Sequence, residues 1–376
     1  MIDVREVKTQ SELELFIDWQ WQLYKDYPYW VPPLRGDMLE DLSGAKLLFK
    51  NGPHVLLLAV QNSEIKGRLC VGIEQGLNQA KQRSEGYISL FECVNDPAIA
   101  AALFDYAALW LKERGMKRIK GPISYNGSDD YRGVLAWGFN RLPAFMNSYN
   151  PPYYPYLFIK CGFVKHEDCF SYYFDLAKSN QYIQSVQPVL MQIAATKEGG
   201  YTRKPALQDA AQAIQEIHWL MAQAMPNDWQ DMIPPSQEEV EQLVNSTLLL
   251  FQEGDLVVAY AGEDRPIGFV VSSNDYNPII KQLDGKVSRR ELAVQAAVSD
   301  KIKGLKAITI FVLPEYQEQG VALLLLADLF ETAKLRGYTY VEGATVGETN
   351  QEMCSFMDSL VGKPSSIYRI YTRDIG

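Results

Sequence analysis

The chain has 376 residues, of which 47% are apolar and 22% are charged, so its composition excludes disorder and low complexity. Lysine and arginine total 36 against 46 aspartates and glutamates, which gives a formal net charge of −10. Because the chain also lacks a basic stripe, nucleic acid is not expected as a partner. At about 100–200 residues per domain, two domains are the default.

Targeting and metal-binding signals are missing from the sequence. Its five cysteines are widely spread without a C-x-x-C pair, which is typical of reduced thiols rather than of a disulfide framework. No signal peptide is visible, and the longest apolar runs fall far short of the ~20 residues that span a bilayer. Three scattered histidines predict no metal site. We therefore expect a cytoplasmic protein without an integral membrane segment.

Several common enzyme signatures are also missing. The sequence has no G-x-S-x-G, no G-x-x-x-x-G-K-[ST], no H-E-x-x-H and no G-x-G-x-x-G. These absences argue against α/β-hydrolases, P-loop NTPases, zincins and ordinary nicotinamide dehydrogenases.

Apolar periodicity and turn residues predict a run of strands and helices in the first half of the chain. Ser11 is the expected N-cap of the first helix, and Asp96 with Pro97 is the start signal of another. In chain order we expect a strand at 2–8, a helix at 11–25, an aromatic, proline-punctuated loop at 27–34, a hairpin of 55–61 and 66–73, a strand at 86–94, a helix at 97–114, a strand at 117–121, a Gly/Asn/Tyr-rich stretch at 122–154, a helix at 156–161 and strands within 163–176.

The second half repeats this order. We expect a strand at 201–206, a helix at 209–224, a helix with a capping-box start at Ser236, a hairpin of 256–262 and 266–272, an insertion at 274–304, a strand at 306–313, a helix at 320–336, a strand at 338–346, a helix at 350–360 and a strand at 366–373. A β-α-α-β-β-β-α-β-α-β order seen twice predicts two α+β domains with mixed sheets. Their expected bounds are 1–176 and 201–376, with a connection at 177–200.

The most informative stretch is residues 308–322. An alternating strand pattern ends at Pro314, and a short loop leads through Gln317-x-x-Gly320-x-Ala322 into an apolar helix. Such a loop places backbone N–H groups at the positive end of a helix, where anions such as a pyrophosphate bind. Because Gly320 and Ala322 are small, a phosphate can approach the backbone closely.

This strand, loop and helix resemble the acyl-CoA motif of the GCN5-related N-acetyltransferase (GNAT) superfamily. The resemblance implies an α+β fold of two tandem GNAT-like domains, each a mixed, mostly antiparallel sheet flanked by helices. It also implies acetyl-CoA or another acyl-CoA as cofactor. The residues that it implies for cofactor binding are Val312, Leu313 and Asn350 at the pantetheine arm, and Gln317, Gln319, Gly320, Val321 and Ala322 at the pyrophosphate.

The general acid and base are marked less clearly. Met357 stands where many GNAT enzymes carry a tyrosine that protonates the departing thiolate, and the last strand offers Tyr368 and Tyr371 instead. Three carboxylates have the chemistry of a base that takes a proton from an amine: Glu342, Glu348 and Glu315. Glu348 and Tyr368 are the expected catalytic residues.

The first half has a matching strand and helix, but the loop between them lacks Q-x-x-G-x-A. Asp96 puts a negative charge where a pyrophosphate would lie, and Pro97 removes an amide donor, so no CoA is expected there. Segments G-P-x-x-x-N at 121–126 and N-P-P-Y-Y at 150–154 resemble a group of bacterial tandem-GNAT proteins, and they suit either a substrate pocket or a domain interface. The candidate substrate-binding residues are Tyr125, Asn126, Asn150, Tyr153 and Tyr154.

Together these features favour an acyl-CoA-dependent N-acyltransferase. The expected transferred group is acetyl. A small-molecule or lipid amine would attack the thioester directly. The alternatives are a non-catalytic protein that binds CoA or a metabolite, and a long-chain acyltransferase. Two questions stay open: the oligomeric state, for which a homodimer is one expectation, and whether the insertion at 274–304 is a lid or a surface loop.

Overall fold

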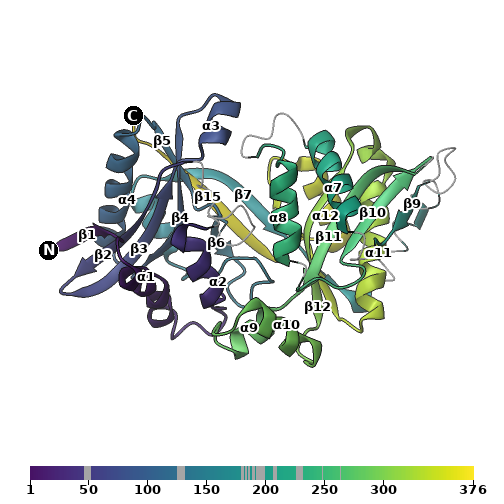
Figure 1. Ribbon diagram of the computed structural model, residues 1–376, viewed down its shortest axis with the longest axis horizontal. Helices are drawn as coiled ribbons and strands as arrows, with labels where there is room; N and C mark the ends of the chain where they lie inside the picture. The colour runs from purple at the N-terminus through teal and green to yellow at the C-terminus, as the bar shows by residue number, and fades with distance from the viewer. Residues whose placement is uncertain are drawn as a thin grey trace.

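The structure, a computed structural model, describes residues 1–45, 52–124, 132–178, 182, 184, 187–188, 191, 200–205, 210–225, 232–247, 249–262 and 264–376. It confirms the expected α+β class: two mixed sheets, mostly antiparallel, are flanked by helices. Figure 1 shows the first half of the chain, purple to teal, beside the green second half. None of the described helices is long and apolar enough to cross a bilayer.

The larger sheet is built mostly from the first half of the chain and has nine strands, in the order β1-β2-β3-β4-β5-β15-β7-β14, with β6 also paired to β15. Its strands are β1 (Ile2–Glu6), β2 (His54–Gln61), β3 (Glu64–Gly72), β4 (Glu85–Cys93), β5 (Arg118–Gly121), β6 (Val134–Trp137), β7 (Val164–Ser171), β14 (Val346–Gly347) and β15 (Ser366–Asp374). The helices of this half are α1 (Gln10–Leu23), α2 (Arg35–Glu40), α3 (Gln75–Lys81), α4 (Pro97–Lys112) and α5 (Tyr154–Lys160), with a π-helical turn at Asp41–Ala45.

The first helix starts earlier than expected. Thr9, and not Ser11, is the N-cap of α1, because the Thr9 hydroxyl accepts from the Glu12 N–H at 3.2 Å. The Glu12 carboxylate in turn accepts from the Thr9 N–H at 3.1 Å, which completes a capping box.

The smaller sheet has six strands in the order β8-β13-β12-β11-β10-β9. These are β8 (Tyr173–Asp175), β9 (Tyr201–Arg203), β10 (Leu256–Ala261), β11 (Arg265–Asn274), β12 (Gly304–Val312) and β13 (Tyr340–Glu342). The helices of this half are α7 (Ala210–Ala224), α8 (Gln237–Thr247), α9 (Asn277–Gln282), α10 (Arg289–Ala297), α11 (Val321–Leu335) and α12 (Gln351–Val361), with 3₁₀ turns at Leu176–Lys178 and Pro314–Gln319.

The two halves of the chain exchange strands. β15, the last strand, leaves the second half and lies between β5 and β7 in the larger sheet, where Tyr371 pairs with Gly121. In the other direction β8 pairs with β13 in the smaller sheet. The single strand expected at 338–346 is two short strands, one in each sheet. The division into domains at residues 176 and 201 stays a prediction. Because of the strand exchange, neither sheet is built from one half of the chain alone.

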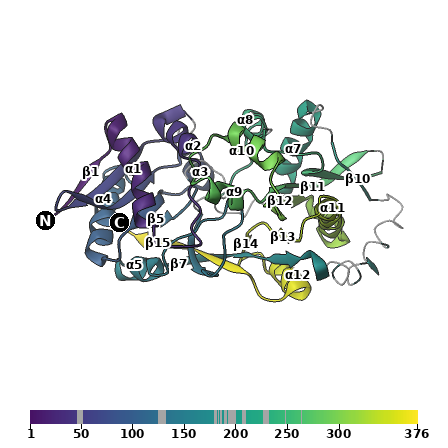
Figure 2. The ribbon, with the colours of Figure 1, turned by 90° about the horizontal axis from the view of Figure 1, so that it is seen from below.

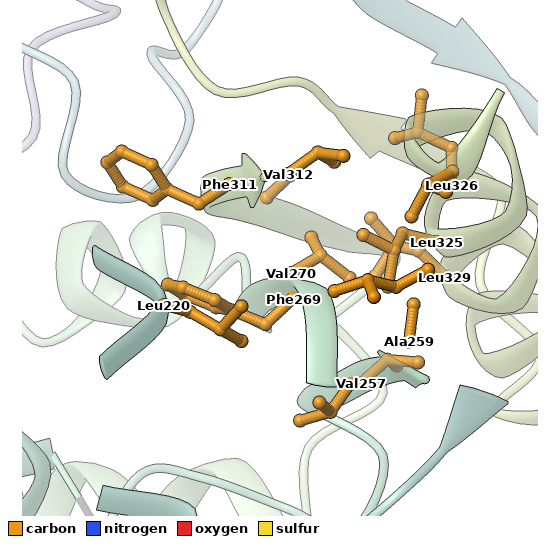
Figure 3. Close-up of a cluster of buried hydrophobic side chains, with 14 of the residues drawn as sticks. Leu220, Val257, Ala259, Phe269, Val270, Phe311, Val312, Leu325, Leu326 and Leu329 are labelled. Atoms are coloured by element: carbon orange, nitrogen blue, oxygen red, sulfur yellow. The ribbon is translucent and has the colours of Figure 1, made fainter. Parts of the chain in front are cut away.

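The core of the second half lies on both faces of the smaller sheet. Figure 3 shows Leu325 and Leu329 of α11 beside Val270 and Ala259, and Leu220 of α7 beside Phe269. The period-2 alternation of β11 sends Phe269 and Val270 to opposite faces, so one strand contributes to both layers. α11, which begins at the candidate cofactor loop, is therefore anchored by fully buried leucines.

The insertion at 274–304 docks on the first half and contains α9 and α10. Asn277 Nδ2 donates to the Pro143 carbonyl at 2.8 Å, Lys281 Nζ donates to the Trp30 carbonyl at 2.7 Å, and Phe145 and Tyr276 meet edge to face. A small core forms between the halves from Leu250, Tyr276, Ile279, Ile280, Leu292 and Ile302, packed against Val31, Leu34 and Phe145. The insertion and the aromatic loop at 27–34 thus hold the two halves together.

A buried carboxylate near the end of α11 predicts a pH-dependent stability. Asp255 is 2% exposed and accepts from Arg336 Nη1 at 2.7 Å, yet burial raises its pKa to about 6. Since the folded state then holds a proton that the unfolded chain has lost, the free energy of unfolding should fall by about 2 kcal/mol between pH 4 and pH 6. Urea unfolding of wild type and Asp255→Asn at both pH values checks this, and equal pH slopes for the two proteins would contradict it.

Candidate active site

Two neighbouring strands of the smaller sheet part near its centre. β12 and β13 pair in parallel over only three positions, from Gly304 with Tyr340 to Lys306 with Glu342. β12 then continues to Val312, and in the described part of the chain its ladder from Ala307 onward runs only to β11. The edge of β12 that faces away from β11 is therefore left without a strand partner there.

Hydrogen bonding shows which peptide groups line this edge. The Leu313 N–H donates to the Ile267 carbonyl at 2.9 Å, on the β11 side. Because antiparallel strands alternate, Val312 and Ile310 point their N–H and C=O groups to the opposite side. A bulge at Ile308 precedes them, since Val271 pairs with Thr309 and Ser272 with Ala307. The result is a strand edge that an extended ligand can hydrogen-bond.

The loop after β12 has the geometry of an anion site. Residues Pro314–Gln319 form a 3₁₀ turn, and Gly320 has a left-handed backbone (φ 80°, ψ 12°) that brings the chain directly into α11. The first N–H groups of an α-helix have no intrahelical acceptor, so those of Val321 and Ala322 are available at the positive end of the helix. Val321 itself is buried, which fixes this end of α11 on the core.

The two glutamines of the loop are exposed and donate to the backbone. Gln317 Nε2 donates to the Val312 carbonyl at 3.1 Å, and Gln319 Nε2 donates to the Glu315 carbonyl at 2.8 Å. Glu315 is paired with Arg265 at 2.7 Å, so the carboxylate of the turn is partly neutralised. A pyrophosphate at this loop would therefore meet N–H donors beside a compensated negative charge.

Asn350 and Met357 both belong to α12. Asn350 is the N-cap of this helix, and its Oδ1 accepts from the Met353 N–H at 3.1 Å. Met357 is 4% exposed and packs against the end of β13, where a Cβ added to Gly343 would lie 3.3 Å from the Met357 Cε. Its thioether cannot donate a proton, so position 357 supplies no general acid.

The two expected catalytic residues lie in different surroundings. Glu348 pairs with Lys165 through Oε2 and Nζ at 2.6 Å, and this hydrogen bond raises the pKa of Lys165. Tyr368 is 2% exposed in β15, and burial raises its pKa, so its hydroxyl stays protonated at neutral pH. The catalytic roles of both residues stay predictions.

A third carboxylate, Glu342, joins the two halves at the point where the strands part. It is 2% exposed and accepts from Ser171 Oγ at 2.7 Å, Ser365 Oγ at 2.8 Å and Arg141 Nη2 at 2.9 Å. Sequence reasoning listed Glu342 but missed Arg141, which lies 201 positions earlier and belongs to no motif. With three donors engaged, Glu342 serves as a tie between the halves.

The first half repeats the parting strands but closes the gap between them. β4 and β5 pair only as far as Tyr87 with Lys120. The Val94 N–H donates to the Lys66 carbonyl on the β3 side, so the peptide groups of Cys93 face the gap, as those of Val312 do in the second half. The Tyr154 hydroxyl accepts from the Cys93 N–H at 2.9 Å, and the Tyr153 hydroxyl donates to the Cys93 carbonyl at 2.8 Å. We call Tyr153 and Tyr154 the tyrosine plug.

The candidate substrate-binding residues are held inside the first half as far as the structure describes them. Asn150 pairs with the Leu135 backbone, accepting from its N–H at 2.6 Å and donating to its carbonyl at 3.2 Å. Tyr153 and Tyr154 form the tyrosine plug. Tyr125 and Asn126 lie outside the described residues. A role for these residues in acceptor binding stays a prediction.

Comparisons with known proteins agree with this geometry. Residues 214–362 match the family model described as "Acetyltransferase (GNAT) family". "Protein YghO" of Escherichia coli (strain K12) is 24% identical over 99% of this chain and 95% of its own, and "Bacterial ceramide synthase" of Caulobacter vibrioides is 25% identical over 99% and 97%. A solved tandem GNAT protein from the clavulanic acid biosynthesis pathway superposes with a TM-score of 0.59 at 12% identity, covering 100% of this chain and 99% of that one. The fold is thus that of two GNAT units in tandem.

Proposed function

Because residues 214–362 match the GNAT family model and the fold is that of a tandem GNAT protein, we propose that this chain is an acyl-CoA-dependent N-acyltransferase whose second half alone holds the acyl donor. The observation that carries the proposal is the contrast between two equivalent strand ends. At Val312 the gap-facing edge has no strand partner in the described part of the chain, and only its carbonyl is engaged, by Gln317. The strand then leads into a glycine turn and a helix N-terminus. At Cys93 the same edge is closed by the tyrosine plug.

The residues of the second half fit such a donor. Peptide groups of Ile310 and Val312 are oriented to hydrogen-bond an extended pantetheine arm, and the amides of Val321 and Ala322 suit a pyrophosphate. When bound, an acyl-CoA supplies a thioester, an acyl group that an amine can attack directly. The new C–N bond replaces the C–S bond, the amine gives up a proton and the departing thiolate takes one.

For these proton transfers we propose Glu348 and Tyr368. The Tyr368 hydroxyl carries a proton at neutral pH that it can give, and the Glu348 carboxylate can take one after its ion pair with Lys165 opens. Since no covalent enzyme intermediate is needed, the lack of an activated nucleophile is no obstacle.

The donor and acceptor are proposed from the relatives. The name of the matching family model, an acetyltransferase family, favours the transfer of an acetyl group to an amine. A relative named bacterial ceramide synthase, aligned over 99% of this chain, favours the other reading, in which a long acyl chain is moved to a lipid amine. Chain length is therefore the property to measure first once CoA binding is established.

The test is a calorimetric titration of CoA and acetyl-CoA against wild type, Gly320→Asp and Gly337→Asp. Gly320→Asp places a side chain and a negative charge at the start of α11, so CoA affinity should fall at least about a hundredfold. Gly337 is the matched control, because it also has a positive φ of 72° but lies at the other end of α11 with open space around it. Its aspartate variant should keep the wild-type affinity.

We expect one CoA site per chain, because the tyrosine plug closes the first half. Wild-type protein that binds no CoA, or a Gly320→Asp variant that binds it as tightly as wild type, would contradict the proposal. Two sites per chain would contradict the part that concerns the first half.

A further inference from the structure

A row of apolar side chains crosses four strands of the larger sheet. Trp137 on β6 pairs with Ile367 on β15, Ile367 pairs with Phe170 on β7, and Phe170 pairs with Val346 on β14. Residues directly opposite each other on antiparallel strands point to the same face of a sheet. We call these four residues the apolar row, and at an interstrand spacing of about 4.8 Å it is roughly 14 Å long.

The apolar row is most exposed at its Trp137 end. Trp137 is 65% exposed, and Ile367, Phe170 and Val346 are all partly exposed. A register shift in β6 turns Trp137 outward although Leu135, two residues earlier, is buried. Figure 2 shows β15 and β7 running between α5 and α12. A tryptophan that leads a solvent-exposed apolar row marks a binding surface.

The other end of the apolar row packs on the core of the second half. Phe170 and Val346 pack on the same hydrophobic cluster as Val312 and Leu313 of the cofactor loop. Val346 is followed by Gly347, whose carbonyl accepts from the Asn350 N–H at 3.0 Å at the start of α12. The apolar row thus leads from the expected pantetheine contact at Asn350 outward to Trp137.

We propose that the apolar row binds the aliphatic chain of a long-chain acyl donor, so that the chain prefers fatty acyl-CoA to acetyl-CoA. The proposal rests on the proposed function, since the thioester end must be held by the second half. Burying this row against a hydrocarbon chain removes apolar surface from water, which supplies the affinity. An acetyl group has only one methyl group to bury, and therefore gains little from the row.

Calorimetry with acetyl-CoA, octanoyl-CoA and palmitoyl-CoA tests this, the last kept below its micelle concentration. Wild type should bind palmitoyl-CoA at least about tenfold more tightly than acetyl-CoA. Trp137→Thr, which keeps a residue suited to a strand, should remove most of this difference and leave the affinity for acetyl-CoA unchanged. Leu109→Ser is the matched control, because Leu109 is 60% exposed on α4, outside the row, and this variant should behave as wild type.

The outcomes separate this inference from the proposed function. Equal affinity of wild type for acetyl-CoA and palmitoyl-CoA overturns the apolar row as an acyl site and leaves the acyltransferase proposal standing. An unchanged preference for long chains in both Trp137→Thr and Ile367→Thr also overturns it. Absence of binding by every CoA ester overturns the proposed function, and the inference with it.

Discussion

Ending the chain at Gly362, so that β15 is removed, should abolish the folded state of the first half. β15 is an internal strand of the larger sheet, with β7 on one edge and β5 and β6 on the other. It also supplies the buried side chains Tyr368, Ile370 and Tyr371 to the core. Without it β7 loses its longest ladder, and the edges of β5 and β7 are left with unpaired peptide groups. Circular dichroism and thermal unfolding should show no cooperative transition for the first half.

A synthetic peptide with the sequence of residues 363–376 sharpens this experiment. Added to the truncated chain, it should restore a cooperative transition, because strand insertion needs only the missing backbone and side chains. Removing Gly376 alone is the control and should leave stability unchanged, since β15 ends at Asp374. A truncated chain that unfolds as cooperatively as wild type would contradict the prediction.

Local patterns predict most elements of this chain but not the sheet that each strand joins. The alternation at 366–373 predicts β15 almost to the residue, yet a strand pattern does not indicate which strand it will pair with. The partner is chosen by packing between residues far apart in sequence, such as Tyr371 stacked on Phe158 with ring centroids 4.7 Å apart. For the same reason, the strand expected at 338–346 could not be divided between two sheets from its sequence.

The candidate site was predictable where its signal is local. A strand end, a left-handed glycine and a helix start lie within residues 312–322, so one sequence window contains the whole loop. The ion pair of Arg141 with Glu342 has no local signal, because its two residues lie 201 positions apart in the sequence. The signal of Tyr153 and Tyr154 is also local but has two readings, because aromatic hydroxyls gathered in a loop suit a substrate pocket or an interface. In the structure both hydroxyls have the backbone of Cys93 as a partner.

The second large effect is expected at Arg68, which lies beneath the tyrosine plug. Arg68 is fully buried, donates through Nη1 to the Phe16 carbonyl at 2.7 Å, and lies 3.8 Å from the Glu92 carboxylate. Glu92 also accepts from the hydroxyls of Tyr24 and Tyr154, each at 2.6 Å. Arg68→Met should therefore cost about 3–5 kcal/mol of unfolding free energy, because it leaves a buried carboxylate without its cation.

The pH dependence of that loss identifies its cause. Burial raises the pKa of Glu92, and the Arg68 charge opposes this rise. Without Arg68 the folded-state pKa of Glu92 rises further, so the folded protein holds a proton that the unfolded chain has released. The free energy of unfolding of Arg68→Met should then fall as the pH rises above about 4.3, which makes its deficit against wild type larger at pH 8 than at pH 5. Urea unfolding at the two pH values measures this difference.

The double variant Arg68→Met with Glu92→Gln separates charge from packing. The glutamine keeps an oxygen that accepts from Tyr24 and Tyr154 but carries no charge, so the double variant should regain at least half of the stability lost in Arg68→Met. Its unfolding free energy should also lose the extra pH dependence. Losses that simply add in the double variant would mean that Arg68 stabilises the first half through its stacking on Phe16 and its bond to the Phe16 carbonyl, and that Glu92 does not need its charge. Recovery would mean that the closed strand edge at Cys93 is built on a compensated buried charge, which the open edge at Val312 does without.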